Sequence, residues 1–372
     1  MKIVIASDSF KGSMTSVDVA QAAAKGIYEV YPDCQVVAVN VADGGEGTVE
    51  AIVDSLGGEI VVARVADPLG REIDARYGIA GDTAIIEMAA ASGLPLLKQE
   101  ERNPWLTSTY GTGEMIMDAI ARGCRQFLVG IGGSATNDAG TGMLQAMGFR
   151  FYDANGEMID HCAGGRMQDI ARIDDSQVPE SVRQSVFTVA CDVDTPFCGP
   201  DGAAPVFAPQ KGADAEMVAR LDAGMASLAK VIADRYGLDV VPVAGAGAAG
   251  GMGGAFYAFL QATLKKGIDM VLDAIDFDKI IEGADFVITG EGKVDFQTAK
   301  GKTAAGVLAR AKQQAIPVIA IGGCVEMCDS LLQMGFAGIY PILEEKVPLE
   351  VAMQRDFAMN NVTKTVARVL KK

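Results

Sequence analysis

Residues 1–12 read MKIVIASDSFKG, and this stretch indicates the fold class. Its apolar run at residues 3–6 predicts a buried strand that ends at polar residues. A helix is predicted next, with Ser16 as its N-cap and Pro32 ending it, before a second strand at residues 36–41. Short, continuously apolar strands that alternate with helices are typical of a parallel sheet covered on both faces.

The pattern changes near residue 60. There Ile73, Ala75 and Tyr77 alternate with polar residues, which predicts an antiparallel sheet with one solvated face. The predicted elements of this middle region are strands at 60–65, 72–77, 84–88 and 127–131 and a helix at 113–121. Residues 150–190 show no clear period, and residues 240–264 predict a loop followed by a buried helix.

Alternating strands and helices return near residue 284. The predicted elements are strands at 285–288, 317–321 and 338–343, and helices at 304–312, at 327–334 and from about 349. Because both ends of the chain share this style, we expect one doubly wound α/β domain formed by residues 1–62 and 275–372. A mixed α/β domain of residues 63–274 would be inserted into it. The sequence does not prove that the two ends share one sheet.

The charge balance excludes several classes of partner. Asp and Glu outnumber Lys and Arg by 48 to 32, which gives a net charge of −16. Such a chain repels nucleic-acid phosphates and anionic lipids, so we expect no nucleic acid and no membrane as a partner. The single histidine, His161, excludes a histidine-rich metal site. Seven cysteines without a CxxC pair favour reduced thiols in a cytoplasmic protein.

Glycine is unusually frequent, with 44 residues in 372. Five glycine-bearing loops follow predicted strands or open predicted helices, at residues 43–48, 108–114, 130–138, 245–254 and 289–293. Glycine allows backbone N–H groups to approach phosphate or carboxylate oxygens closely. A single loop of this kind is more often a tight turn, but the five together predict at least one anion site.

Standard nucleotide-binding motifs are weak in this sequence. Residues 301–303, Gly-Lys-Thr, end like a P-loop, but Phe296 stands where its first glycine is required. Residues 245–250 satisfy GxGxxG, although a dinucleotide site normally lies beside the first strand of the domain. An NAD-dependent oxidoreductase of small hydroxy acids therefore stays an alternative. A non-catalytic binder of small acidic metabolites is a second alternative.

Carboxylates and lysines in or near these loops are candidates for chemistry. Acids at strand ends can coordinate Mg²⁺ or accept a proton from a substrate hydroxyl, although each one alone is more often a cap or turn residue. The acidic candidates are Asp8, Asp43, Glu46, Asp138, Asp192, Asp194, Glu291 and Asp295. Lys11, Lys211 and Lys293 are candidate cations for phosphate or carboxylate groups.

Several longer sequence strings identify a protein family more specifically than single glycine motifs do. They are IASDSFKG (5–12), VADGGEGT (41–48), EMAAASGL (87–94), GIGGSATND (130–138), PQKGA (209–213), the glycine-rich residues 245–253 and TGEGKVD (289–295). In this order, and over essentially the whole chain, the sequence resembles the bacterial type-1 glycerate kinase family. Ser7, where that family commonly has proline, and the run from about residue 323 depart from the pattern.

This resemblance implies a transferase that phosphorylates an organic acid. The expected reaction is ATP-dependent phosphorylation of D-glycerate with Mg²⁺, giving 2-phosphoglycerate in preference to 3-phosphoglycerate. The expected architecture is a Rossmann-like domain and a second α/β domain, with the active site in the cleft between them. The expected partner is a small-molecule substrate, and the question of whether the protein forms a homo-oligomer stays open.

Residue roles are inferred within this resemblance. Phosphate groups are expected at Gly132, Gly133, Ser134 and Thr136 and at Gly245, Gly247 and Gly250, with further cofactor contacts from Gly290 and Lys293. Asp43 or Asp192 is expected to act as the base or as a Mg²⁺ ligand, and Asp295 is the next metal candidate. Lys11 and Lys211 are expected to neutralise the glycerate carboxylate or the transferring phosphoryl group.

Overall fold

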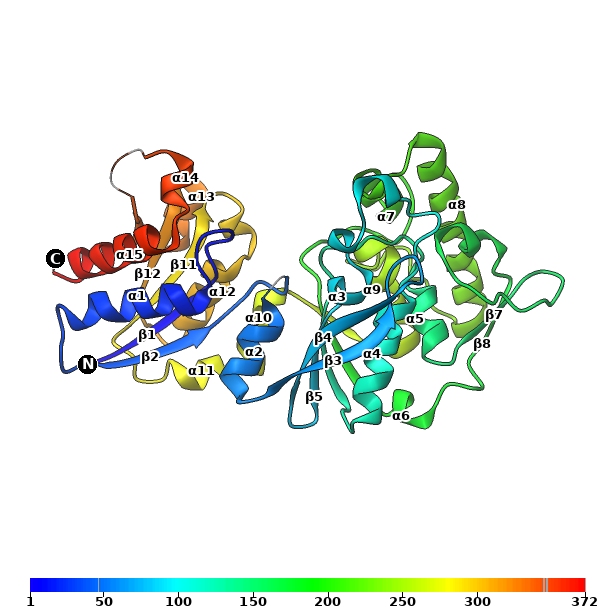
Figure 1. Cartoon of the computed structure of the whole chain (residues 1–372), viewed down its shortest axis with the longest axis horizontal. Helices are drawn as coiled ribbons and strands as arrows, with labels where there is room; N and C mark the ends of the chain where they lie inside the picture. Colours follow the sequence, from blue (N-terminus) through cyan, green and yellow to red (C-terminus); the bar gives the residue numbers. More distant parts are fainter. Residues whose placement is uncertain (46, 344, 346, 372) are drawn as a thin grey trace. The chain divides into compact units, whose positions relative to one another are not determined.

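In a computed structural model the chain is described at residues 1–45, 47–343, 345 and 347–371 (Figure 1). It divides into two units. Unit 1 consists of Met1–Asp43, Glu50–Leu56 and Ile268–Lys372, and unit 2 consists of Gly44–Val49 and Gly57–Gly267. The predicted domain boundaries and the predicted cleft between domains stay predictions.

The sheet of unit 1 contains strands from both ends of the chain, the point that the sequence left open. Its strands are β1 (Lys2–Ser7), β2 (Gln35–Asn40), β11 (Phe286–Val294), β12 (Val318–Val325) and β13 (Gly338–Pro341). All are parallel, in the spatial order β13-β12-β11-β1-β2. The strand order therefore reverses between β1 and β11. In sheets of this kind, ligands bind outside the carboxyl ends of the strands at that reversal.

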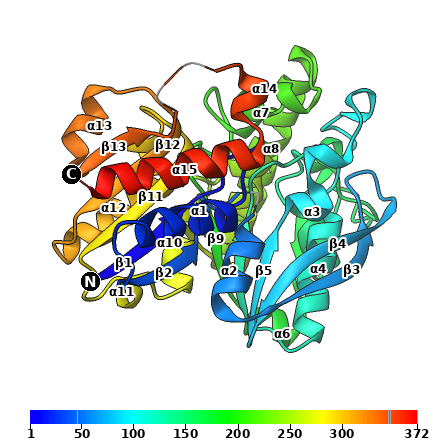
Figure 2. The same cartoon turned by 60° about the vertical axis from the view of Figure 1, so that its left-hand side comes forward.

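Helices cover both faces of this sheet because its strands are apolar on both sides. The helices that begin or end in unit 1 are α1 (Ser16–Tyr28), α2 (Thr48–Leu56), α10 (Gly267–Ala274), α11 (Phe277–Ile280), α12 (Thr303–Gln313), α13 (Asp329–Met334), α14 (Leu349–Ala352) and α15 (Arg355–Leu370), with the 3-10 helix η5 (Thr298–Lys300). Figure 2 shows α1 and α15 side by side, and they pack against each other. Ile3 and Ile5 of β1 share a buried cluster with Val362 and Val366 of α15.

Some predicted boundaries in unit 1 are wrong. The N-cap of α1 is Thr15 and not Ser16, because Thr15 forms a capping box with Asp18 three residues later. The terminal helix predicted from about residue 349 is interrupted, so that α14 and α15 are separate. The strand predicted at 285–288 continues through the predicted glycine loop at 289–293, because these residues pair with β12.

Unit 2 contains a six-stranded mixed sheet of order β10-β9-β6-β5-β4-β3. Its strands are β3 (Glu59–Ala66), β4 (Glu72–Ala80), β5 (Thr83–Glu87), β6 (Gln126–Gly130), β9 (Val186–Ala190) and β10 (Thr263–Lys265). The first three pair antiparallel, as their alternation predicts, and the others are parallel. The predicted α/β class is confirmed, and the structure shows a parallel sheet in unit 1 and a mixed sheet in unit 2.

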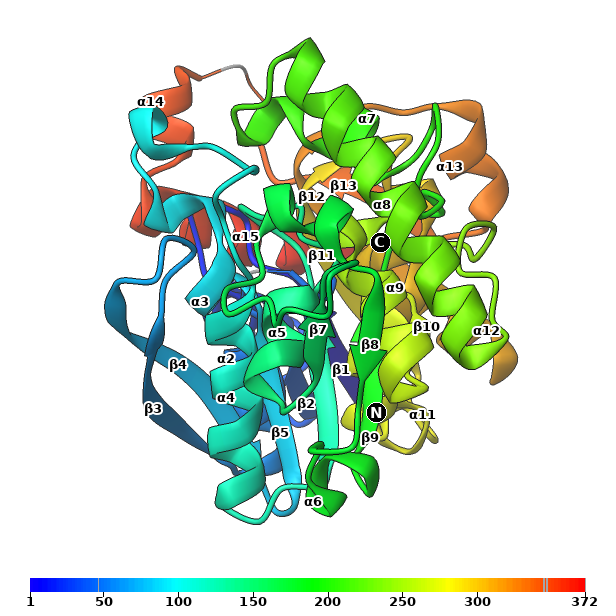
Figure 3. The ribbon, with the colours of Figure 1, turned by 90° about the vertical axis from the view of Figure 1, so that its right-hand side faces the viewer.

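Helices and a small second sheet complete unit 2, with α4 beside the antiparallel strands (Figure 3). The helices are α3 (Ala89–Ser92), α4 (Tyr110–Ala121), α5 (Thr141–Ala146), α6 (Glu180–Arg183), α7 (Ala203–Phe207), α8 (Ala215–Tyr236) and α9 (Ala248–Leu260). The 3-10 helices are η1 (Leu94–Leu96), η2 (Gln99–Glu101), η3 (Gly164–Asp169) and η4 (Pro209–Lys211). The stretch that the sequence left unassigned forms β7 (Arg150–Tyr152), β8 (Arg172–Asp174), η3, α6 and β9. Among the described helices, none combines the length and the apolar character needed to cross a membrane.

Candidate functional site

The strand reversal of unit 1 brings two buried carboxylates to one edge of the sheet. Asp8 directly follows β1, and its N–H donates to the carbonyl of Gly290 in the neighbouring β11 at 3.0 Å. The Asp8 carboxylate accepts from the Thr303 hydroxyl at 2.9 Å and from the Ser9 N–H at 2.6 Å. Burial, and next the negative charge of Asp43, raise the pKa of Asp8 above its ordinary value.

Glu291 lies one residue further along β11 and is 6% exposed. Burial raises the pKa of this carboxyl to about 7, although a hydrogen bond with Thr298 and the positive charge of Lys302 act in the opposite direction. The nearby charges of Asp8 and Asp295 make smaller contributions that raise it. Its Oε1 atom is buried and has no hydrogen-bond partner among the described residues. A buried carboxylate oxygen without a donor is costly, so this position favours a ligand that supplies a donor or a cation.

Lysines lie among these acids. Lys11 Nζ lies 3.8 Å from an oxygen of Asp43, which follows β2. Lys293 Nζ lies 3.2 Å from Asp295 and 3.0 Å from Glu326. Burial raises the pKa of Asp295, but the Gln297 N–H and Lys293 lower it by more, so that its pKa is below the ordinary value. The acidic candidate Glu46 lies outside the described residues.

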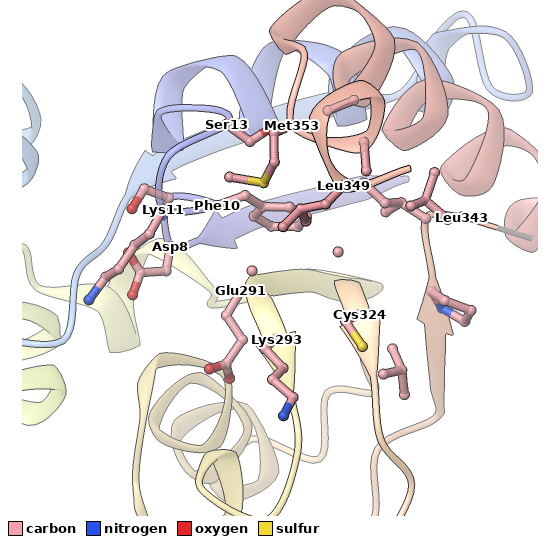
Figure 4. Close-up of a pocket in the computed structure, with 18 of the residues that line it drawn as sticks. Asp8, Phe10, Lys11, Ser13, Glu291, Lys293, Cys324, Leu343, Leu349 and Met353 are labelled. Atoms are coloured by element: carbon pink, nitrogen blue, oxygen red, sulfur yellow. The ribbon is translucent and has the colours of Figure 1, made fainter. Parts of the chain in front are cut away.

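A cavity of about 770 Å³ lies at this edge, within unit 1 (Figure 4). Its charged and polar lining comes from Asp8, Ser9, Lys11, Ser13, Asp43, Glu291, Lys293 and Lys302. Its apolar lining includes Phe10, Val325, Ile342, Leu343, Leu349 and Met353. In Figure 4 the charged ends of Asp8, Lys11 and Glu291 lie away from Leu343 and Leu349. Titratable groups with shifted pKa values inside a cavity of this size are typical of functional sites.

Gly290 lies in β11, so the predicted glycine loop at this residue is wrong, whereas the predicted cofactor contact of Gly290 stays a prediction. This residue occupies the middle of β11, and a Cβ there would lie 2.8 Å from the side chain of Ile321 and 3.0 Å from Ser7 Oγ. The crowding between two neighbouring strands explains this glycine without a ligand.

Unit 2 places a second group of predicted residues together. Lys211 is 1% exposed, and its Nζ donates to Ser134 Oγ at 2.7 Å and to the Thr136 carbonyl at 2.6 Å. Burial lowers the pKa of Lys211 to about 7, while the negative charge of Asp138 acts in the opposite direction. Lys211 therefore holds the loop after β6 in place and does not reach solvent.

Asp138 organises the same loop from its other end. Its carboxylate accepts from the Thr109 N–H and hydroxyl, both at 2.8 Å, and from the N–H groups of Gly140 and Gly142. Burial raises its pKa despite these four donors. Gly132 and Gly133 lie at the start of this loop, between the end of β6 and the residues that Lys211 holds, and both are exposed. An added Cβ on Gly132 would have no atom within 4 Å. The turn at Gly132 and Gly133 is therefore open to a ligand, whereas the residues after it are fixed.

The glycines at 245–250 have a different environment. A Cβ on Gly245 would lie 2.6 Å from Cys191 Sγ. Added Cβ atoms on Gly247 and Gly250 would overlap the carbonyl oxygens of Pro196 and Thr136. Gly250 also has φ +68°, at a kink inside α9. Close backbone packing explains these glycines, so the GxGxxG match is no evidence for a dinucleotide.

Asp192 follows β9 in unit 2 and is exposed, and its Oδ1 accepts from the Gly267 N–H at 3.0 Å. Across residues 1–45, 47–343, 345 and 347–371, no group of three or more His, Cys, Asp or Glu side chains is arranged to hold a metal ion. Mg²⁺ in phosphoryl-transfer sites uses one or two carboxylates together with substrate phosphates, so single acids here fit that ion.

Sequence reasoning named Asp8 and Glu291 only as acids among others. Their position at the ends of two apolar runs was the available signal, but their pairing required the knowledge that these runs are neighbours. The incomplete P-loop motif gives no signal for Lys302 and Thr303, yet the Thr303 hydroxyl donates to Asp8 and Lys302 lines the cavity.

Replacing Lys211 by methionine should change how stability depends on pH. The folded pKa of about 7 lies below the ordinary value. The unfolded chain therefore holds one more proton between about pH 7 and pH 10, and wild-type stability should rise with pH by up to about 1.4 kcal/mol per unit. Urea unfolding at pH 7 and 9 should show wild type gaining stability relative to Lys211→Met. Exposed Lys230→Met is the control, and a pH-independent difference for Lys211→Met would contradict the burial of a titrating amine.

Comparisons with known proteins agree with this architecture. The model of the glycerate kinase family matches residues 3–372. A protein named glycerate kinase from Halalkalibacterium halodurans is 46% identical, covering 99% of this chain and 97% of its own. A protein named glycerate 2-kinase from Escherichia coli K12 is 44% identical, covering 99% and 98%. A crystal structure from Salmonella typhimurium LT2 matches with a TM-score of 0.91 and 43% identity, covering 100% of this chain and 97% of its own. The chain therefore belongs to the glycerate kinase family of phosphotransferases.

Proposed function

We propose that this protein transfers the terminal phosphoryl group of ATP to the 2-hydroxyl of D-glycerate, giving 2-phosphoglycerate. The observation that carries the proposal is the 44% identity, over 99% of this chain, with a relative named glycerate 2-kinase. The arrangement of residues supports phosphoryl transfer, which depends on positioned charges and needs no histidine.

The residues of unit 1 suit the charges of this reaction. Lys11 lies at the cavity with its side chain 63% exposed, so it can move toward an anionic group. Asp43 faces Lys11 and is positioned to accept the proton of the substrate hydroxyl. Asp192 is the alternative base, and its exposed carboxylate follows a strand of unit 2. The base is a carboxylate in either case.

Mg²⁺ is part of the proposal because carboxylate oxygens are its preferred protein ligands. Asp192 and Asp295 are each a predicted ligand. In unit 1, Glu291 is a further carboxylate that fits the ion, because its buried Oε1 has no hydrogen-bond partner among the described residues. When bound, the ion would neutralise charge on the nucleotide phosphates. The residues of this chain would hold it and keep those phosphates in position.

The loop after β6 is the proposed phosphate contact of unit 2. Gly132 and Gly133 are exposed, and Ser134 and Thr136 are held by Lys211. A turn that is open to solvent and anchored by fixed neighbouring residues can present backbone N–H groups to an anion without reorganising. Lys211 acts here as a positioning residue, which differs from the direct substrate contact that we expected from the sequence.

An assay of ADP release with D-glycerate, followed by phosphorus NMR of the product, tests the proposal. We expect ADP release that depends on D-glycerate and a phosphorus signal coupled to the C2 proton. A signal coupled to the C3 protons would establish 3-phosphoglycerate instead. Glycerate binding without ADP release would favour the non-catalytic binder, and stabilisation by a nicotinamide nucleotide in place of ATP would favour the oxidoreductase. The cytoplasmic location and a homo-oligomeric state stay predictions.

A further inference from the structure

The cavity of unit 1 is much larger than the proposed acceptor requires. Its volume of about 770 Å³ lies within the range of about 300–1,000 Å³ typical of sites for drug-sized ligands and cofactors. A three-carbon hydroxy acid would fill only a small part of it and would leave the apolar part uncovered. The lining combines an apolar part around Phe10, Leu343 and Leu349 with a charged part around Asp8 and Glu291. Lys302 also lines the cavity, and its charge acts on Glu291. The occupant should therefore have one flat or apolar portion and one charged portion.

The charged part of the lining contains a buried carboxylate that needs a hydrogen-bond donor or a cation. Glu291 is 6% exposed, lines the cavity and has an oxygen without a hydrogen-bond partner among the described residues. Asp8 adds a second buried carboxylate, and the charges of the two groups repel each other. A cation or a hydrogen-bond donor carried by the ligand would relieve both the desolvation and the repulsion.

The start of α12 supplies an anion-binding element beside these acids. Gly301 has φ +108°, in the left-handed region, and Lys302 is the N-cap of this 11-residue helix. The Lys302 side chain makes no capping hydrogen bond to the first N–H groups. Lys302 lines the cavity, and Thr303 is tied to Asp8 through its hydroxyl. The Gly-Lys-Thr sequence thus lies where uncapped N–H groups and a lysine favour phosphate oxygens, although the complete P-loop motif is absent.

We propose that this cavity is the nucleotide site, with the base of a nucleoside triphosphate against the Phe10 and Leu349 wall and its phosphates toward Lys302 and the start of α12. Glu291 and Asp8 would face the Mg²⁺ that accompanies the phosphates. The inference rests on the proposed kinase function and deepens it, because it assigns the apolar part and the Lys302 end of this cavity to the nucleotide and leaves the end at Lys11 and Asp43 to the acceptor acid. The position at the strand reversal is where such sheets bind their ligands.

Two cysteines make the proposal testable on the wild-type protein. Cys324 is exposed and lines the cavity, whereas Cys328 lies four residues later outside the lining, and neither forms a disulfide. The alkylation of both thiols by N-ethylmaleimide can be followed by peptide mass spectrometry with MgADP, D-glycerate or Mg²⁺ alone. At MgADP near ten times its Kd, alkylation of Cys324 should slow about tenfold, because only the ligand-free fraction reacts. Cys328 should react at an unchanged rate, and D-glycerate or Mg²⁺ alone should not protect Cys324.

Protection of Cys324 by D-glycerate in place of MgADP would overturn the assignment. Equal slowing of both cysteines, or no slowing, would overturn it too. Failure of the kinase proposal gives a different result, namely protection by MgADP without ADP release in the presence of D-glycerate. ADP release without protection would leave the kinase proposal standing and place the nucleotide elsewhere.

A variant that fills the cavity supplies an independent measurement. Cys324→Trp adds bulk beside the apolar wall and should raise the KM for ATP about tenfold or more, while the KM for D-glycerate stays within about twofold. Cys328→Trp is the matched control and should leave both values unchanged. A rise confined to the KM for D-glycerate would overturn the proposal. Thermal unfolding of each variant identifies a loss of folding before the kinetics are compared.

Discussion

Replacing Asp43 or Asp192 by asparagine is expected to lower kcat by about two to four orders of magnitude if the replaced carboxylate is the base. Asparagine keeps the size of the side chain and one carbonyl oxygen, so the acceptor for the Gly267 N–H is preserved at position 192. The Asp43 pair with Lys11 contributes little to stability, because the charges are 3.8 Å apart and the Lys11 side chain is 63% exposed. Both variants should therefore remain folded.

The kinetics separate a base from a Mg²⁺ ligand. A lost base should reduce kcat at every Mg²⁺ concentration, whereas a lost ligand should be partly rescued when Mg²⁺ is raised. The exposed residues Asp33 in unit 1 and Asp201 in unit 2 offer matched Asp→Asn controls with wild-type rates expected. Near-wild-type kcat values for both Asp43→Asn and Asp192→Asn would contradict the assignment of the base to these two residues.

Gly250→Ala should be strongly destabilising, because the new Cβ would overlap the Thr136 carbonyl oxygen at a residue with φ +68°. The left-handed backbone costs an alanine about 1 kcal/mol, and overpacking against backbone adds roughly 1–3 kcal/mol. Urea unfolding, monitored by circular dichroism, should show the sum of both effects.

Gly237 offers the matched control for this substitution. It has φ +67°, nearly the same backbone conformation, with no atom within 4 Å of an added Cβ. Gly237→Ala should therefore lose only the backbone part, about 1 kcal/mol. If the two variants are equally stable but Gly250→Ala binds ATP much more weakly, the packing explanation is wrong and the glycine tract contacts phosphate.

These two experiments address what the sequence left undecided. The order of strands and helices in unit 1 was predictable because apolar runs and helical periods are local properties. The antiparallel strands of unit 2 were predictable from alternation at Ile73, Ala75 and Tyr77. The conformation and role of the glycine-rich segments were harder to predict. Residues 289–293 form a strand, and residues 245–250 are packed against backbone from distant segments.

The candidate site was predictable in part. Lys11 and Asp43 were named from the sequence, and they lie together at the cavity of unit 1. Glu291 and Lys302 gained their significance only from the structure. The surroundings of Glu291 depend on Asp8, which is distant in the chain but lies on the neighbouring strand. Lys211 was named as a cation for the substrate, but its partners are Ser134 and Thr136.

The sequence by itself determined the α/β class and the resemblance to one kinase family, because periodicity and long sequence strings are local properties of the chain. The tertiary structure alone decided which glycines are open to a ligand and which are closed by backbone. It also decided which acid has a buried oxygen with no hydrogen-bond partner among the described residues, and which lysine holds a loop. Each of these properties depends on the space and charge supplied by residues far away in the sequence, and only folding brings those residues together.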